Sequence, residues 1–195
     1  MAINNFPPFI KENYDIFEWN HASAILENDF PAEWDDIISI LTNFRLHKSH
    51  IIIGGGGRSL VSQSLDEPFY SIGWVEHEFN TQISVDNEIK ITPTHKVDCV
   101  KNKVALEIEW SNKDPFYDRD LNNFRLLFER DAIDVGVIIT KSDELRQIME
   151  RLGIWSKYGT STTWISKLIP RINGGGGGGC PILVFGIKKS LFVED

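Results

Sequence analysis

Cysteine is scarce in this chain, with only Cys99 and Cys180 among its 195 residues. The two lie far apart in the sequence, and neither belongs to a CxxC pair or to a set of cysteines and histidines with the spacing of zinc ligands. A disulfide framework or a structural zinc site is therefore excluded as the basis of the fold. So few cysteines are typical of a protein from a reducing compartment.

Long apolar runs are absent as well. No uninterrupted run approaches the ~18 residues that a membrane-spanning helix needs. The start of the chain, MAINNFPPFIKENYD, lacks the basic and then apolar order of a signal peptide. We therefore expect a cytoplasmic protein without a membrane partner.

Positive charge is in short supply too, since the formal net charge is -8. Phosphate binding usually leaves a basic footprint, so this total argues against a nucleic-acid partner. The charges are unevenly distributed, however: residues 1–140 hold 12 Lys and Arg against 23 Asp and Glu, whereas residues 141–189 hold 8 against 3. The basic segment leaves a polyanionic partner open, although such a block is also typical of an ordinary solvated surface.

Apolar sequence is sufficient for one core, since 42% of the residues are hydrophobic, and we expect a single domain over residues 1–195. After an extended start that contains proline, apolar spacing predicts helices over 30–41, 58–73, 118–130, 144–152 and 164–171. Strands are predicted within 74–91, with a turn at Asp86 and Asn87, and over 104–110, 135–139 and 182–187. Because helices and strands interleave, the pattern predicts an α/β or α+β sheet covered by helices.

Two glycine runs stand out, GGGGRS at 54–59 and NGGGGGGCP at 173–181. Neither matches the phosphate-cradling P-loop or the glycine pattern of a dinucleotide-binding turn. Composition alone favours flexible loops. The alternative is that a backbone without side chains approaches a ligand closely.

The stretch HKVDCVKNKVALEIEW, residues 95–110, contains two glutamates in what otherwise reads as an apolar strand. Its residues alternate, which sets two faces of the strand apart. One face would carry Val104, Leu106, Ile108 and Trp110, and the other Ala105, Glu107 and Glu109. An exposed acidic strand face is the ordinary explanation of this pattern.

The residues Asn102 and Lys103 are suited to the two-residue turn of a hairpin, because Asn tolerates a left-handed conformation. Counting outward from this turn places Asp98 directly across from Glu107, with Glu109 further along the same face. Three carboxylates would then converge on one face of the hairpin.

Such a cluster needs compensation, because like charges in facing positions repel each other. A bound cation, a shifted pKa, or Lys96, which the same register sets opposite Glu109, would each supply it. Mg²⁺ suits the cluster, since it takes oxygen ligands and usually only one or two carboxylates. It would activate a water for attack on a phosphate ester, with Glu109 orienting that water or accepting its proton.

The order of these motifs resembles the PD-(D/E)xK nuclease core and, in its finer spacing, the BglII and BstYI group of type II restriction endonucleases. The likeness covers nearly the whole chain. It rests on Asp98-x8-Glu107-x-Glu109 and on NHASAIL, EWDDIISIL, Gly73-Trp74, VDCVKNKVALEIEW, IDVGVIITK and PILVFGI, each with a counterpart in the same order. The resemblance implies a restriction-endonuclease-like core, a central mixed β-sheet flanked by helices, in a single endonuclease domain.

By this resemblance, Asp98 and Glu107 are ligands of one or two Mg²⁺ ions, and the backbone carbonyl of Ile108 is a further ligand. Glu109 takes the place of the lysine of the wider superfamily and of the glutamine of BglII. This departure leaves two roles open for Glu109, water orientation and general base catalysis.

An accessory polar residue helps to organise the site in this group. Its place shortly after Trp74 implies Glu76 or His77. An exposed His77 without a role is the alternative.

The resemblance further implies a homodimer that cuts both strands of duplex DNA within a short palindrome, leaves 5′ phosphates and acts beside a DNA methyltransferase. A GATC core is common among the relatives. The region 157–180 matches the position of a recognition loop, whose DNA-binding residues would be Lys157, Thr160, Ser161, Thr162, Thr163, Lys167 and Arg171. Small hydroxyl residues also start helices, so a purely structural role for them is open.

Two other functions stay open at this point. One is a DNA-binding module that keeps the nuclease fold without cutting, which the intact Asp98, Glu107 and Glu109 disfavour. The other is a structure-specific repair or recombination nuclease, which would use the same metal site on junctions or flaps.

Overall fold

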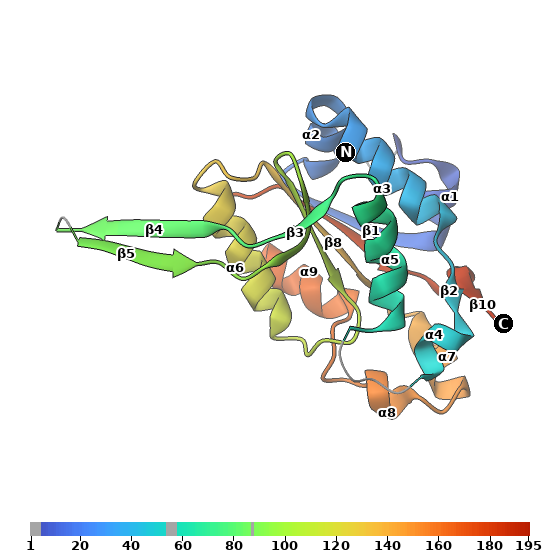
Figure 1. Ribbon diagram of the computed structural model, residues 1–195. Helices are drawn as coiled ribbons and strands as arrows, with labels where there is room; N and C mark the ends of the chain where they lie inside the picture. Colours follow the sequence, from blue (N-terminus) through green and yellow to red (C-terminus); the bar gives the residue numbers. More distant parts are fainter. Residues whose placement is uncertain (1–4, 54–57, 87) are drawn as a thin grey trace.

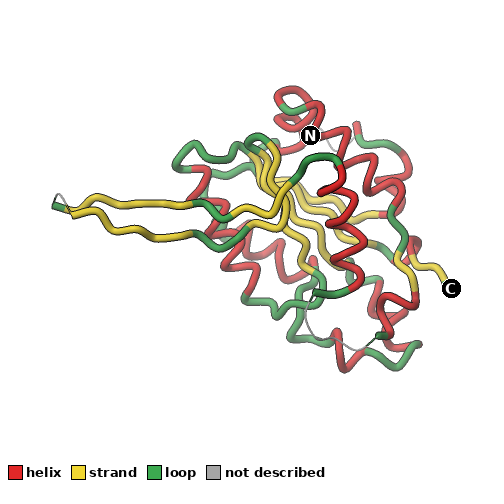
Figure 2. The backbone as a smooth tube through the Cα atoms, in the orientation of Figure 1, coloured by secondary structure: helices red, strands yellow, loops and turns green. Residues whose placement is uncertain are grey.

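The computed structural model describes residues 5–53, 58–86 and 88–195. At its centre lies a six-stranded mixed sheet in the order β1, β9, β8, β7, β6, β3 (Figures 1 and 2). In that order the strands span Tyr14–Trp19, Ile182–Ile187, Val135–Lys141, Val104–Glu109, Val97–Lys101 and Val75–His77. Because helices cover both faces of this sheet, the predicted α/β architecture is confirmed.

Three parallel strands form the middle of the sheet. β7, β8 and β9 run parallel, whereas β1 at one edge and β6 and β3 at the other pair antiparallel. Parallel neighbours need crossover connections. One crossover is α6 (Phe116–Phe128), and the other contains α7 (Leu145–Arg151), α8 (Trp155–Tyr158) and α9 (Ile165–Asn173). The central strands are buried along their whole length, as expected for strands covered on both faces.

The helices predicted from apolar spacing are present. They correspond to α3 (Pro31–Asn43), α5 (Leu60–Ser71), α6, α7 and α9. Proline stands in the first turn of α3. The side chain of Ser59 caps α5, because its Oγ accepts a hydrogen bond from the Ser62 backbone N–H at 3.0 Å.

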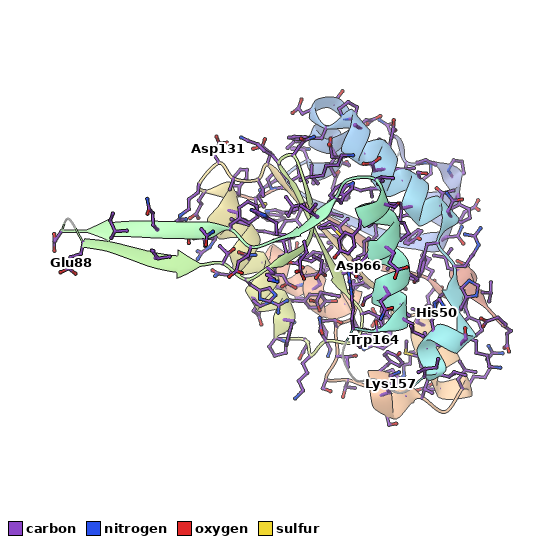
Figure 3. All side chains as sticks on the ribbon, viewed as in Figure 1. His50, Asp66, Glu88, Asp131, Lys157 and Trp164 are labelled. Atoms are coloured by element: carbon purple, nitrogen blue, oxygen red, sulfur yellow. The ribbon has the colours of Figure 1, made fainter. Side chains whose placement is uncertain are left out.

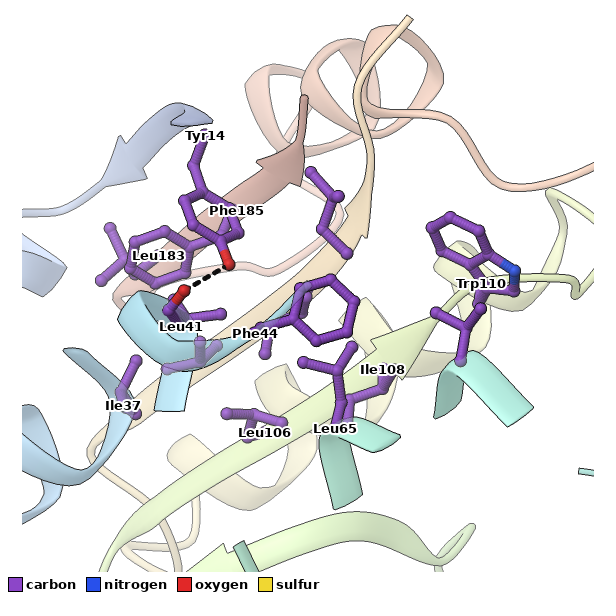
Figure 4. Packing of buried hydrophobic residues seen from close by; sticks show 14 of the residues in the cluster. Tyr14, Ile37, Leu41, Phe44, Leu65, Leu106, Ile108, Trp110, Leu183 and Phe185 are labelled. Carbon is purple, nitrogen blue, oxygen red and sulfur yellow. Dashed lines mark hydrogen bonds between the residues drawn. The ribbon is translucent and has the colours of Figure 1, made fainter. Parts of the chain in front are cut away.

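Side chains alternate along β7 and contribute to a different apolar core on each face of the sheet. On one face Leu106 and Ile108 pack with residues of α3 and α5 (Figure 4). In the same core the Tyr14 hydroxyl donates to the Leu41 carbonyl at 2.7 Å. On the other face Ala105 packs with residues of α6 and α9. The predicted alternation is confirmed, and neither face of this strand meets solvent.

The beginning of the chain differs from the prediction of an extended segment. It forms a helix, α1 (Pro8–Asn13), then β1 and a second helix, α2 (Ala22–Asp29). Proline is compatible with the first turn of a helix, whose N–H groups have no intrahelical partner, so it did not exclude α1. Further short elements are β2 (Leu46–His47), α4 (Lys48–Ile52), a 3-10 turn (Lys189–Leu191) and β10 (Phe192–Val193), of which β2 and β10 pair in parallel.

A hairpin of β4 (Asn80–Val85) and β5 (Glu88–Pro93) projects far from the body of the molecule (Figure 1). Asp86 stands at its tip with φ +49°, as the predicted turn requires, whereas Asn87 lies outside the described residues. Ile89 and Ile91 on β5 are 65% and 73% exposed. The arm therefore carries apolar side chains into solvent.

The second glycine run packs against the protein itself. A Cβ on Gly177 would lie 2.4 Å from the Ile182 side chain, and one on Gly178, where φ is +57°, 2.7 Å from Arg125 of α6. The close approach that glycine allows here is thus to β9 and α6, and no ligand is needed to account for it. The first glycine run, residues 54–57, lies outside the described residues.

Candidate active site

The hairpin of β6 and β7 has the register that the sequence predicts. Lys101 pairs with Val104, and Asn102 adopts a left-handed conformation with φ +51°. Beyond the paired residues, Glu107 Oε2 accepts a hydrogen bond from the Asp98 backbone N–H at 3.3 Å. Asp98 Oδ2 in turn accepts one from the Ile108 backbone N–H at 2.9 Å. The two predicted metal ligands are therefore neighbours, next to the predicted third ligand.

Both glutamates of β7 are buried. Glu107 and Glu109 are each 1% exposed. An exposed acidic strand face is therefore the wrong explanation of the sequence pattern. The physical reason is α6, which covers this face and brings a further carboxylate, the fully buried Asp120, toward both glutamates.

The carboxyl groups of this cluster bind protons more tightly than usual. Burial, with Asp120 and Asp98 nearby, raises the pKa of Glu107 well above its ordinary value. Burial and Asp120 raise the pKa of Glu109 to about 9, and burial raises the pKa of Asp120 to about 6. Glu109 and Asp120 are neighbours in this cluster, so the negative charge of Asp120 disfavours ionisation of Glu109.

Compensating positive charge comes from α6. Arg119 Nη2 lies 3.5 Å from Glu109 Oε1 and 2.7 Å from Asp120 Oδ1. Asn112 Nδ2 adds a hydrogen bond to Glu109 Oε1 at 3.0 Å. Lys96, one of the three sources of compensation that the sequence left open, does not pair with Glu109, because its Nζ lies 3.0 Å from Glu76 at the surface.

Three oxygens of the cluster lack a hydrogen-bond partner among the described residues. They are Glu107 Oε1, Glu109 Oε2 and Asp120 Oδ2, all buried. Buried carboxyl oxygens without donors are costly, and a hard cation is a partner that suits them. In the part of the chain that the structure describes, no three Asp, Glu, His or Cys side chains form a ready-made metal cage. Mg²⁺ does not need such a cage, because it uses one or two carboxylates and keeps waters.

A small polar pocket lies beside Asp98. It is lined by Arg58, Ser59, Ser62, Asp66, Asp98, Ile108, Ser111 and Asn112. Asp66, on α5 (Figure 3), is a buried carboxylate that sequence reasoning missed. Burial and the nearby Asp98 raise the pKa of Asp66 to about 7. The signal for it was a polar stripe on α5, Ser62, Asp66 and Tyr70 at steps of four residues, beside the apolar Val61, Leu65 and Phe69.

Comparison with known proteins identifies the family of this chain. The family model described as restriction endonuclease BglII/BglIII matches residues 14–187. The chain belongs to this family. A search of curated proteins found no match. The family makes this protein a DNA-hydrolysing type II restriction endonuclease, and the mixed sheet flanked by helices is consistent with a restriction-endonuclease-like fold.

The predicted accessory residues of this endonuclease lie outside the pocket beside Asp98. Glu76 is in the surface ion pair with Lys96. The ring of His77 is exposed and stacks edge-on against Phe79 at 4.5 Å. Asp66 of α5, by contrast, lines that pocket.

The predicted recognition segment of the endonuclease follows α8, next to the end of β7. Thr162 pairs with Lys113 in an isolated bridge, and Thr163 N donates to Asn112 O at 3.0 Å. Thr160 and Ser161 are exposed. The hydroxyls of Thr162 and Thr163 are buried and bond to main-chain carbonyls of the protein. The segment therefore has an outward pair and an inward pair of hydroxyl residues.

The basic residues predicted to bind DNA are partly engaged within the protein. Lys157, in the α8 region at the lower edge of Figure 3, donates to the Ile53 carbonyl. Lys167 lies 3.3 Å from Asp114, and Arg171 lies 3.0 Å from Asp118. These contacts orient the three cations and reduce their free charge. Among the described helices, none is long and apolar enough to span a membrane.

Proposed function

We propose that this endonuclease is Mg²⁺-dependent and cuts both strands of a short palindrome, leaving 5′ phosphates. The observation that carries the proposal is the proximity of Asp98 and Glu107 to a group of buried carboxyl oxygens, those of Glu107, Glu109 and Asp120, that lack hydrogen-bond donors among the described residues. A cluster with raised carboxyl pKa values destabilises the protein at neutral pH unless a cation offsets it. Binding of a divalent cation would therefore account for this carboxylate cluster.

Asp98, Glu107 and the carbonyl of Ile108 would hold the ion. When bound, Mg²⁺ polarises a phosphoryl oxygen and lowers the pKa of a coordinated water. Asp98 Oδ2 is already oriented by the Ile108 N–H, which fixes that carboxylate before DNA arrives. The attacking water forms one P–O bond while the P–O3′ bond breaks, and the 3′ oxygen takes up a proton.

Glu109 would orient the attacking water. Its pKa of about 9 means that it carries a proton at neutral pH without a cation. A nearby positive charge lowers such a pKa, so Glu109 can accept a proton from water only in the loaded site. Asn112 and Arg119 hold the carboxyl in place for either role.

The other functional assignments follow the family. A homodimer would match its two-fold symmetry to that of a palindrome and deliver one site to each strand. Residues 157–180 would read base edges, and a DNA methyltransferase would protect the host sequence. The enzyme would act in the cytoplasm.

Cleavage of a mixed-sequence linear duplex in Mg²⁺, followed by sequencing of the ends, tests this function. Intact protein is compared with Glu107→Ala and with Ca²⁺ in place of Mg²⁺, and sedimentation gives the oligomeric state. We expect discrete palindromic ends that both substitutions abolish. Tight binding without any cutting would instead indicate a non-catalytic DNA-binding module. Sequence-independent cutting at junctions or flaps would indicate a structure-specific nuclease.

A further inference from the structure

The site lacks the lysine that Glu109 replaces, so a side-chain cation that acts on the phosphate beside the proposed Mg²⁺ would have to be another residue. Lys96 is at the surface with Glu76. Two arginines, Arg58 and Arg119, lie close enough to Asp98 to favour its charged form. They are the candidates for a cation at the reacting phosphate.

The guanidinium of Arg119 binds the carboxyl groups of the cluster. Its Nε and Nη2 donate to Asp120 Oδ1 at 2.9 and 2.7 Å, and Nη2 also lies near Glu109. Its guanidinium carbon lies 4.3 Å from the centre of the Phe116 ring. Arg119 is also not among the residues that line the pocket beside Asp98. Its charge is therefore used to hold buried carboxyl groups.

Arg58 faces the pocket that Asp98 and Ile108 line. Its Nη2 donates to Asp66 Oδ2 and, at 2.8 Å, to the Tyr70 hydroxyl, and the guanidinium carbon lies 5.3 Å from the centre of the Tyr70 ring. The Asp66 side chain is 2% exposed and that of Arg58 44%, so the guanidinium is anchored on its inner side and open on its outer side. Among the described residues, none accepts a hydrogen bond from its Nε or Nη1.

The rest of the pocket suits an anion. Ser59 and Ser62 line it from the first turn of the 12-residue helix α5, next to Arg58. The N-terminal end of a helix favours negative charge. Asp98 and Ile108 line the same pocket, where the proposed cation would lie, and the Asp66 carboxylate in its lining is paired with Arg58. A phosphate in this pocket would contact both the cation and Arg58.

We propose that Arg58 is a catalytic residue whose guanidinium binds the non-bridging oxygens of the scissile phosphate, an assignment that rests on the proposed phosphodiester hydrolysis. A guanidinium presents two parallel N–H groups to such oxygens. It exchanges no atom during the reaction and keeps its protons. It stabilises the negative charge that grows on these oxygens while the new P–O bond forms and the P–O3′ bond breaks.

The test uses the full chain and compares Arg58→Ala and Arg58→Lys with the parent. Arg130→Ala serves as the matched control, since Arg130 is exposed and its side chain donates to the Leu126 carbonyl of the preceding helix, α6. The rate constant for single-turnover cleavage at saturating DNA should be about 10²–10³-fold lower in Arg58→Ala than in the parent, as is usual when one hydrogen-bond donor to the transition state is removed. The Kd for DNA, measured in Ca²⁺, should change by less than about tenfold, as for one phosphate contact. The single-turnover rate of Arg58→Lys should lie between those of the parent and Arg58→Ala, because lysine keeps the positive charge and lacks the two parallel N–H groups of the guanidinium.

Chemical rescue distinguishes a catalytic from a structural role. Added guanidinium ion, below denaturing concentration, should restore part of the single-turnover rate of Arg58→Ala and leave Asp66→Asn unchanged. Equal rates for Arg58→Ala and the parent would overturn the assignment while the endonuclease function stands. A lost rate that comes with a lower melting temperature and no rescue would also overturn it and make Arg58 a support for Asp66. A parent protein that cuts no duplex would overturn the proposed function itself and with it any catalytic role for Arg58.

Discussion

The side-chain nitrogen of Lys141 donates a hydrogen bond to the main-chain carbonyl of Trp110, the residue that follows Glu109. Lys141 ends β8 and is fully buried. Its nitrogen also lies 3.2 Å from Thr163 Oγ1 and 5.2 Å from the Trp164 ring centre. One side chain thus ties the catalytic strand to the segment predicted to read DNA.

The first prediction concerns this lysine. Burial lowers the pKa of Lys141 to about 7. Between about pH 7 and pH 10.5 the folded state therefore holds fewer protons than the unfolded state. The cost of burying the charged Lys141 lowers the free energy of unfolding fully below pH 7, and this cost decreases as the pH rises. The free energy of unfolding of Lys141→Met should exceed that of the parent most near pH 6.5, and this difference should shrink by up to about 1.4 kcal/mol per pH unit above 7.

Urea denaturation at several pH values measures the difference, and the exposed Lys189→Met serves as the control. A difference between Lys141→Met and the parent that does not change with pH would contradict the lowered pKa.

A second prediction concerns Glu109 in the metal-free protein. Its raised pKa means that the folded state holds a proton that the unfolded state loses, so stability falls as the pH rises from about 4.5 to about 9. Glu109→Gln removes this pH-dependent loss of stability and keeps a side-chain oxygen that accepts the hydrogen bond from Asn112 Nδ2. We expect a gain of about 1–3 kcal/mol at pH 8, or about 2–4 °C in Tm per kcal/mol, and almost none at pH 4.5. Glu76→Gln, at an exposed ion pair, should show no such pH dependence. Glu109→Gln gains that are equal at both pH values would exclude a raised pKa.

Divalent metal should stabilise the DNA-free protein. A ligand at a hundred times its Kd adds about 2.7 kcal/mol to the free energy of unfolding. Thermal unfolding with and without excess Mg²⁺ or Ca²⁺ should therefore show a higher Tm in the parent. Asp98→Asn and Glu107→Gln should lose this shift, whereas the exposed Glu150→Gln should keep it. The same shift in all four proteins would mean that the metal binds elsewhere.

The two pairs of hydroxyl residues in the recognition segment should behave differently. Thr160→Ala and Ser161→Ala, at exposed positions, should leave Tm unchanged and alter the ratio of DNA binding between the cleaved palindrome and single-base variants of it. Thr163→Val, whose buried hydroxyl serves the Glu109 and Trp110 carbonyls, should cost about 1–3 kcal/mol of stability and leave this ratio unchanged. Binding is measured in Ca²⁺ at fixed salt. A changed ratio for Thr163→Val alone would reverse the assignment.

The second glycine run offers a matched pair of substitutions. Gly178→Ala places a Cβ at positive φ and within 2.7 Å of Arg125, so we expect a loss of about 1–2 kcal/mol. Gly179→Ala meets only the Phe128 ring, at 3.4 Å, and should cost much less. Denaturant midpoints measure both, and equal losses would contradict the packing of this loop on α6.

The sequence predicted the hairpin register well because local chemistry determines it. Asn102 sets the turn, and the turn sets Asp98 beside Glu107. It also predicted the helices whose apolar faces repeat with the helical period. These features depend on residues that are near each other in the chain.

What escaped prediction depends on tertiary packing. Asp120 and Arg119 reach the glutamates only because α6 folds back over β7, and Asp66 reaches Asp98 only because α5 packs on the opposite face. In the sequence, Asp120 is an ordinary first-turn acid and Lys96 an equally plausible partner for Glu109. Spacing along a chain cannot rank such partners, because it does not say which helix covers which end of a strand.

The position of β9 between β1 and β8 has a consequence for synthesis of the enzyme. Residues 14–19 are made long before residues 182–187, with which they pair in the sheet. The sheet that supports Glu107 and Glu109 can therefore close only after residues 182–187 have been translated. Until β9 has been made, β8 has an unpaired edge, so the strand order makes completion of this central sheet a late event in synthesis, after the carboxylate hairpin itself is in place.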